Sequence, residues 1–290
     1  MRINFASNKI FLRSKNKMLL KLTDDDFYRL VDFMKKNYGI NLEKKRVLIE
    51  GRLSNTVSSR GFKTFKEFID FAFADKTGKE TMQLVNKLTT NHTYFMREPE
   101  HFEYLKTTLL PYFEKTNRDK TLNVWCAASS TGQEPYTLAM TIDEYFAGKG
   151  WVIRILATDL DTDVLAAASS GVYTADQMKD VPAAWVTKYF TKLDANTYQA
   201  SDKLRKMIEF RQFNLMDKIP VGRKYDLISC RNVMIYFEMD TKNALVERFY
   251  DVTKEGGYLY VGHAESVGKG TRYTYIKPAI YRKISSDKKV

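Results

Sequence analysis

The sequence has little cysteine and no long apolar run. Two cysteines occur among its 290 residues, Cys126 and Cys230, each inside an apolar stretch typical of a buried strand. Such thiols suit a reducing compartment better than a disulfide framework. No stretch reaches the roughly 20 apolar residues of a membrane span, and the first residues lack the apolar core of a signal peptide. We therefore expect a globular protein of the cytoplasm.

Negative charge is scarce in the first third of the chain. Residues 1–97 hold 20 Lys and Arg against 10 Asp and Glu, whereas the remaining residues hold 27 against 25. Of the net charge of +12, +10 therefore belongs to this first third. A basic lobe beside a nearly neutral one favours contact with an acidic surface, such as nucleic acid, anionic lipid or an acidic protein. A solvated surface that only confers solubility is the alternative.

Helical spacing dominates the first third. Residues 1–20 carry five basic side chains and no acid, which is typical of a flexible basic tail. Thr23 and Asp26 have the form of a capping box, and apolar residues then recur at helical spacing up to Gly39. Further helices are predicted near residues 47–61, 64–72 and 80–88. Residues 21–90 are therefore expected to form an all-helical domain.

Strands and helices alternate after a helix that begins near Pro99. The predicted strands are buried apolar runs at residues 122–128, 152–157, 207–213, 225–230 and 257–261, followed by a hairpin over 273–276 and 279–282. Residues 172–206 interrupt the alternation and suggest a small inserted β-subdomain. The pattern predicts an α/β domain over residues 91–290, with a mostly parallel, Rossmann-like sheet.

The loop after the first strand resembles a nucleotide-binding turn without its glycines. Ser129 to Tyr136 contain Gly132 alone, so the three-glycine dinucleotide fingerprint is absent, as is a P-loop. Glu134 would repel a pyrophosphate but pair with an ammonium group, which S-adenosylmethionine carries. An ordinary turn between strand and helix explains the loop equally well.

Polar residues follow the other predicted strands. Asp159 ends the second strand, where a nucleoside site places the carboxylate that accepts hydrogen bonds from ribose hydroxyls. Asp161 is predicted to cap the next helix. Asn214 and the segment 230–237 follow two further strands, and although Asn214 alone is a common turn former, four polar strand ends together favour a binding site.

These segments resemble the CheR family of chemotaxis receptor methyltransferases. The matching stretches, in family order, are residues 88–99, 130–136, 157–159, 214–215, 230–237 and 257–266. The resemblance implies a helical domain that recognises receptor helices, a class I methyltransferase domain that uses S-adenosylmethionine, and an inserted β-subdomain that in some members docks a receptor's C-terminal tether peptide. His92 and the turn Ala127–Ser130 depart from the common family pattern.

The resemblance also assigns residues to the cofactor and to catalysis. The implied cofactor-binding residues are Asn91, Thr93, Arg97, Glu134, Asp159, Asn214, Leu215, Arg231 and Asn232. Arg97 and Tyr236 would lie beside the methyl group. An ion pair of Arg97 with Glu98 or Glu134 is the structural alternative.

The implied reaction converts a receptor glutamate to its methyl ester and leaves S-adenosylhomocysteine. A glutamate with a pKa of about 4.3 is already ionised at neutral pH, so no general base is needed. Arg97 is expected to orient that carboxylate. His92, His101 and His263 lack metal-ligand spacing and are interpreted as surface or helix-cap residues, so no metal is expected.

Four basic residues are predicted to meet the substrate. Lys44, Lys45, Arg46 and Arg52 are placed on the second helix, where they would attract a receptor helix that bears several glutamates. A nucleic-acid methyltransferase and a non-catalytic scaffold are the alternatives. The basic charge lies away from the catalytic domain, and a scaffold has no use for a complete cofactor pocket.

Overall fold

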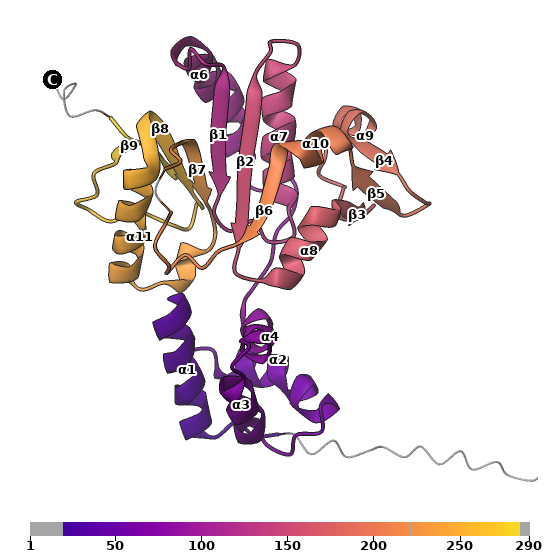
Figure 1. The fold of residues 1–290 in the computed structure, drawn as a ribbon, viewed down its shortest axis with the longest axis vertical. Coiled ribbons are helices and arrows are strands. Elements are labelled where there is room, and N and C mark those ends of the chain that lie inside the picture. The colour runs from indigo at the N-terminus through magenta and orange to yellow at the C-terminus, as the bar shows by residue number, and fades with distance from the viewer. Residues whose placement is uncertain (1–19, 221, 285–290) are drawn as a thin grey trace, which may run out of the picture.

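The structure, a computed structural model, describes residues 20–220 and 222–284. A small group of helices lies below a larger α/β part in Figure 1. Nearly all of the predicted basic tail, residues 1–19, lies outside the described residues. Within the described residues, no helix is both long enough and apolar enough to cross a membrane.

The first part consists of the four predicted helices. These are α1 Asp24–Tyr38, α2 Arg46–Ser59, α3 Phe65–Ala74 and α4 Lys79–Leu88. The hydroxyl of Thr23 accepts from the backbone N–H of Asp26 at 3.2 Å, as the predicted cap requires. The shorter Asp26 carboxylate accepts from the Thr23 hydroxyl at 2.8 Å rather than from the Thr23 backbone. Gly39, at φ 71°, ends α1.

The second part is built on one seven-stranded sheet. In spatial order its strands are β6 (Ile208–Gln212), β2 (Val152–Asp159), β1 (Thr121–Cys126), β7 (Tyr225–Cys230), β8 (Thr253–Val261), β10 (Ile280–Arg282) and β9 (Thr274–Lys277). The first five are parallel, and β10 is antiparallel to β8 and β9. The predicted Rossmann-like fold with a closing hairpin is confirmed. Strand β8 begins four residues earlier than predicted. The prediction relied on apolar residues, and the first residues of β8 are polar.

Helices cover both faces of this sheet. They are α5 Glu100–Tyr104, α6 Leu110–Thr116, α7 Gln133–Phe146, α8 Thr162–Ser170 and α11 Met239–Val252, and a π-helical turn, Leu105–Leu109, joins α5 to α6. Alternate strand residues divide the core, so that Val124 packs with α5 to α7 whereas Trp125 packs with α11. The core on the α11 side continues into the helical part.

The segment between α8 and β6 is the expected inserted subdomain. Its three-stranded antiparallel sheet has the order β3 (Val172–Thr174), β5 (Thr197–Ala200) and β4 (Phe190–Lys192). The insertion also holds the short helices α9 (Ala183–Tyr189) and α10 (Asp202–Met207). It lies beside α7 and α8, at the edge of the molecule opposite α11 (Figure 1).

The end of α1 fastens the helical part to the sheet. The Asn214 side chain donates to the carbonyl of Asn37 at 2.8 Å, and the N–H of Asn41 donates to the carbonyl of Tyr236 at 2.9 Å. Gly39 lies between these contacts, where a Cβ atom would stand 2.7 Å from the Met216 sulfur and 3.2 Å from Thr241 Cγ2. Glycine is therefore required here for its φ angle and for space.

This contact predicts a difference between two glycines. Gly39→Ala and Gly78→Ala each place a side chain at positive φ, 71° and 73°, but no atom of the described residues lies within 4 Å of the Cβ position at Gly78. Each change should cost about 1 kcal/mol of unfolding free energy for the backbone. Gly39→Ala should cost more, because Met216 and Thr241 must also move. Urea unfolding compares the two, and equal losses would show that the contact is not tight.

Candidate functional site

A cavity of about 330 Å³ lies between the helical part and the carboxyl ends of β1, β2 and β7. In open α/β sheets, ligands bind at this edge. Tyr38, Ile40, Leu42, Lys45, Leu48 and Arg52 form the wall from the helical part. The turn after β1, the end of β2 and the loops after β6 and β7 form the opposite wall. Two parts of the chain therefore enclose one site.

The structure brings the predicted site residues together. All nine residues predicted to bind the cofactor line this cavity, as does Tyr236. They come from the linking segment after α4 and from the ends of four strands. The cavity is also lined by apolar residues that the sequence analysis did not assign to the site, among them Leu48, Leu88, Leu160 and Phe213.

The turn after β1 is built around Ser130 and Asp159. Ser130, at φ 48°, donates its N–H to Asp159 Oδ2 at 2.8 Å, and its hydroxyl donates to the carbonyl of Asn91 at 2.9 Å. Gly132, at φ 95°, leaves no room for a side chain, since its Cβ would lie 2.9 Å from Ala168 Cβ. The turn therefore tightens around the end of β2.

Asp159 offers a fixed carboxylate to the cavity. Its Oδ1 accepts from the N–H of Asp161 at 3.0 Å, and burial raises the pKa of Asp159 above its usual value. Asp161 caps α8 as predicted, by accepting from the N–H groups of Asp163 and Val164, and it also accepts from the Asn91 side chain at 2.7 Å. Two neighbouring carboxylates thus have separate tasks.

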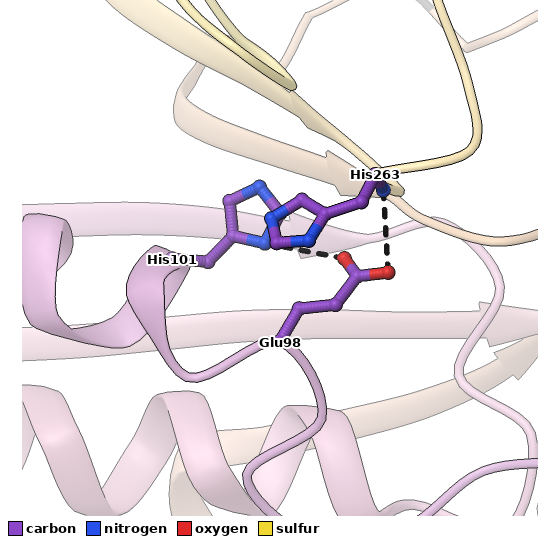
Figure 2. Close-up of side chains that lie close together, drawn as sticks. All are labelled: Glu98, His101 and His263. Carbon is purple, nitrogen blue, oxygen red and sulfur yellow. Dashed lines mark hydrogen bonds and ion pairs between the residues drawn. The ribbon is translucent and has the colours of Figure 1, made fainter.

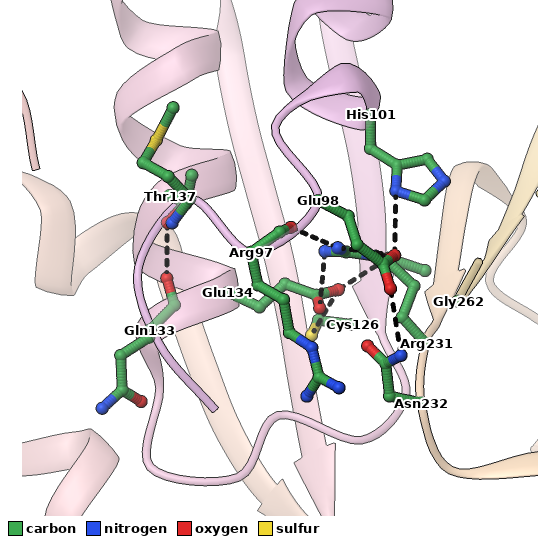
Figure 3. Close-up of polar contacts among 12 residues, drawn as sticks. Arg97, Glu98, His101, Cys126, Gln133, Glu134, Thr137, Arg231, Asn232 and Gly262 are labelled. Atoms are coloured by element: carbon green, nitrogen blue, oxygen red, sulfur yellow. Dashed lines mark hydrogen bonds and ion pairs between the residues drawn. The ribbon is translucent and has the colours of Figure 1, made fainter. Parts of the chain in front are cut away.

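Arg231 is the centre of a buried charge network (Figure 3). Its side chain is 1% exposed, with Nη1 at 2.9 Å from Glu134 Oε2 and Nη2 at 3.0 Å from Glu98 Oε2. Nη2 also donates to the carbonyl of Arg97. Burial opposes the charge of Arg231, but Glu134 and Glu98 together raise its pKa. Burial likewise disfavours ionised Glu98, yet His101 Nδ1 at 3.4 Å, a hydrogen bond from Asn232 and the charge of Arg231 hold its pKa well below its usual range.

This network excludes the ion pair of Arg97 with Glu98 or Glu134 that was the structural alternative. Arg231, not Arg97, pairs with Glu98 and Glu134. Arg97 instead donates Nη1 to the carbonyl of His92 at 2.8 Å, and its guanidinium lies 5.7 Å from the ring centre of Tyr94. Glu134, which was expected to pair with a ligand ammonium, already faces a guanidinium and also accepts from the Ser229 hydroxyl at 2.6 Å. Its charge is therefore balanced within the protein.

Two carboxylates that the sequence analysis did not assign shape the loop after β7. Asn232 has a φ of 60°, and its side chain donates to Glu98 Oε1 at 3.1 Å. The backbone N–H of Asn232 donates to Glu265 Oε2 at 2.8 Å. A short 3-10 helix, Met234–Tyr236, follows and carries Tyr236 to the cavity. Both acids stand inside the family-like stretches, but nothing in their spacing reveals their partners.

A group of three potential metal ligands lies behind this network. The ligand atoms of Glu98, His101 and His263 lie within 4.8 Å of one another, and Figure 2 shows the rings of the two histidines close together above the Glu98 carboxylate. His101 is 1% exposed and lies inside α5, so its interpretation as a surface or helix-cap residue is wrong. Burial lowers the pKa of His101, which favours its neutral form. His263 is exposed, as predicted.

The four basic residues predicted to meet the substrate differ in their contacts. Lys44 and Lys45 are exposed and precede α2, which begins only at Arg46, so their placement on the helix is wrong. Arg46 donates to the carbonyl of Leu22 at 2.9 Å and stacks on Phe27. Arg52 holds the linking segment by donating to the carbonyls of Leu88 and Thr89 and to the hydroxyl of Thr90. Two of the four therefore stabilise the helical part.

Comparison with known proteins agrees with this geometry. The CheR methyltransferase all-alpha domain matches residues 25–89, and the CheR methyltransferase SAM binding domain matches residues 91–281. A chemotaxis protein methyltransferase of Borreliella burgdorferi is 38% identical over 278 residues, which are 93% of this chain and 98% of that protein. Those of Salmonella typhimurium and Escherichia coli are 31% and 32% identical and cover 93% and 85% of this chain, and 93% and 86% of their own lengths. The resemblance noted in the sequence is confirmed, and the chain belongs to the CheR family of S-adenosylmethionine-dependent chemotaxis methyltransferases.

Proposed function

We propose that this chain esterifies glutamate side chains on the helices of chemoreceptors. The supporting observation is the cavity at the carboxyl end of the sheet, which gathers all nine implied cofactor residues and is closed by a basic helical domain. S-adenosylmethionine, when bound, supplies a methyl group activated by a sulfonium. We place the helical domain at residues 21–90 and the methyltransferase domain at residues 91–290.

The residues of the cavity fit that cofactor. Asp159 is fixed by two backbone N–H groups and keeps acceptor capacity for ribose hydroxyls. Leu160, Phe213 and Leu215 offer apolar contact to an adenine ring. Asn91, Thr93, Asn214 and Asn232 add polar groups around it. The balanced pair of Arg231 and Glu134 would meet the methionine part, whose ammonium and carboxylate also carry opposite charges.

The two sides of the cavity differ in charge, and the difference suits a cationic cofactor on one side and an anionic substrate on the other. Glu134 and Asp159 line the sheet side, where Arg231 balances Glu134 and leaves Asp159 as the acid without an ion-pair partner among the described residues. Lys45, Arg52 and Arg97 line the side formed by the helical domain and the linking segment. A cationic sulfonium is favoured near the acids and an anionic glutamate near the bases. This arrangement aligns the attacking oxygen with the methyl group, which is the main contribution that an enzyme can make to such a displacement.

Arg97 and Tyr236 are the residues that we assign to the reacting groups. The Arg97 guanidinium has no carboxylate partner within the described residues, and only Nη1 is engaged, by the carbonyl of His92. It is therefore free to hold the substrate carboxylate. Tyr236 lines the same cavity and would lie beside the methyl group.

We propose no metal for this reaction. Both oxygens of Glu98 already accept hydrogen bonds, Oε1 from Asn232 and the N–H of His263 and Oε2 from Arg231. A guanidinium 3.0 Å from Oε2 would repel a cation placed between Glu98, His101 and His263. We assign Glu98 to the charge network instead.

Receptors are proposed to approach along the outer side of the helical domain. A groove lined by Phe27, Tyr28 and residues 43–48 shares Lys45 and Arg52 with the cavity. An acidic helix lying there would have a basic path to the cofactor. The edge strand β4 of the inserted sheet is the place where a tether peptide would add a strand.

The direct test is transfer of a radiolabelled methyl group to receptor fragments. We expect labelling of receptor protein and release of the label as methanol by mild base, which cleaves carboxyl esters. Label that enters nucleic acid would favour the alternative methyltransferase, and binding of receptors without any labelling would favour a scaffold.

The free, buried cysteines agree with action in a reducing cytoplasm.

Replacement of Asp159 tests the ribose contact. Asp159→Ala should weaken binding of S-adenosylhomocysteine by about 1–3 kcal/mol, because buried donors lose their acceptor. Asp163→Ala removes an exposed carboxylate in the first turn of α8, the helix that follows Asp159, and should leave affinity unchanged. Calorimetry measures both, and an unchanged affinity for Asp159→Ala removes this residue from the site.

Replacement of Arg97 tests the orientation of the substrate. Arg97→Ala should lower kcat at least tenfold while the protein stays folded. A rise of about 1.4 kcal/mol in the activation free energy, from loss of the contact that orients the substrate carboxylate, is enough for that factor. Arg97→Lys should restore only part of kcat, because an ammonium lacks the planar fork. Arg118→Ala, in the exposed turn before β1, serves as the control. Normal turnover in Arg97→Ala would contradict the assignment.

Reversal of two exposed charges tests receptor recognition. Lys44→Glu with Lys45→Glu should raise the KM for receptor and flatten its dependence on salt, whereas affinity for S-adenosylhomocysteine stays the same. Surface pairs contribute only about 0–1 kcal/mol each, so the association rate should carry most of the effect. Lys76→Glu with Lys79→Glu makes the same charge change at two exposed residues, one in the turn before α4 and one at its first position. If both double variants behave alike, the site near α2 does not select the substrate.

A further inference from the structure

Glu265 is a buried carboxylate that has no part in the reaction as described above. It follows β8 and is 7% exposed. Its hydrogen bonds come from the backbone: Oε2 accepts from the N–H groups of Gly262 at 2.6 Å and Asn232 at 2.8 Å, and Oε1 accepts from that of Ile235 at 3.1 Å. Burying a carboxylate costs free energy of folding, and the three N–H groups compensate for it. A role for Glu265 in the structure of the site would explain why it is buried here.

Two of these three N–H donors belong to a loop that lines the cavity. Asn232 and Ile235 lie at either end of the loop that presents Asn232, Val233 and Tyr236 to the cavity. Asn232 is held at φ 60°, a conformation that side chains other than glycine rarely adopt. Glu265 binds the backbone of this residue while Glu98 binds its side chain at 3.1 Å. The loop is thus held from two directions.

Gly262 permits this arrangement. A Cβ atom at residue 262 would lie 2.9 Å from the backbone nitrogen of Asn232 and 2.9 Å from Glu265 Oε2. The side chain of Asn232 would be closer still, at its Nδ2 atom, so a Cβ atom at residue 262 would displace Asn232 or Glu265. The glycine and the carboxylate therefore act on the same loop.

We propose that Glu265 is a positioning residue, which sets the shape of the loop over residues 231–236 and thereby the places of Asn232 and Tyr236 in the cavity. This inference rests on the proposed function for its effect on cofactor binding. Only a carboxylate fulfils the role, because both of its oxygens accept. An amide would turn its NH₂ group toward at least one N–H donor.

The test compares Glu265→Gln with Asp226→Asn in the full chain. Asp226 is a matched control: it is 1% exposed, stands at the opposite end of β7, and accepts from the N–H of Asn123 at 2.8 Å and from Lys254 at 2.8 Å. Two quantities are measured, the Kd for S-adenosylhomocysteine by calorimetry and the hydrogen–deuterium exchange of residues 231–236 without ligand.

Glu265→Gln should raise this Kd at least tenfold and speed exchange in the loop. Asp226→Asn should lower the Tm but keep the Kd within twofold and the loop exchange unchanged. Gly262→Ala, which keeps the carboxylate and crowds the same loop, should change the Kd and the exchange in the same direction as Glu265→Gln, and it replaces that variant should Glu265→Gln fold poorly.

The proposal is overturned if Glu265→Gln keeps the wild-type loop exchange, or if its Kd stays within twofold of wild type. It is also overturned if Asp226→Asn lowers the Tm by the same amount as Glu265→Gln and raises the Kd by the same factor. Absence of S-adenosylhomocysteine binding by the wild-type protein would refute the proposed function instead. Loop exchange would then still decide the role of Glu265, since it needs no ligand.

Discussion

The buried guanidinium of Arg231 joins three segments that are far apart in the sequence. Its two partners, Glu98 and Glu134, come from the segment before α5 and from the first turn of α7, and it extends from the end of β7. Removing one partner from a buried ion pair typically costs about 3–5 kcal/mol, because the other charge remains without water. The relative positions of these segments, and so of the cavity wall that they form, depend on this one group.

The network also separates structural charge from functional charge. Arg231 is satisfied by carboxylates and a backbone carbonyl, whereas Arg97, beside it, has one carbonyl as its hydrogen-bond partner in the part of the chain that the structure describes. Asp161 caps a helix while Asp159 faces the cavity. In both cases a neighbouring residue of the same type meets the needs of the fold. The other side chain then stays available to a ligand.

The sequence predicted the features that depend on neighbours along the chain. Periodicity and caps located α1 to α4, and the apolar runs located the parallel strands, because these signals are local. Residues that follow parallel strands meet at one edge of the sheet, which is why the sequence alone indicates that Asp159, Asn214 and Arg231 share a site.

What the sequence did not predict are pairings across long separations. Glu98 and Arg231 are 133 residues apart, and no pattern distinguishes this pair from one between Glu98 and Arg97. The burial of His101 likewise depends on the packing of Tyr260, whose ring centre lies 4.8 Å from its own. Packing of this kind becomes visible only when the whole sheet is in place.

The continuous core beneath the cavity has a consequence for the order in which the chain folds. The helical part is synthesised first, but its apolar residues share a cluster with Leu245 and Phe249 of α11 and with Val261 of β8. Domains fold from the N-terminus as they emerge from the ribosome, and apolar surface that awaits its partner is prone to aggregation. The nascent helical part therefore carries an uncovered apolar face until the segments of the α/β part that complete this cluster have been made. A chaperone that shields such faces would find its target there, well before any cofactor site exists.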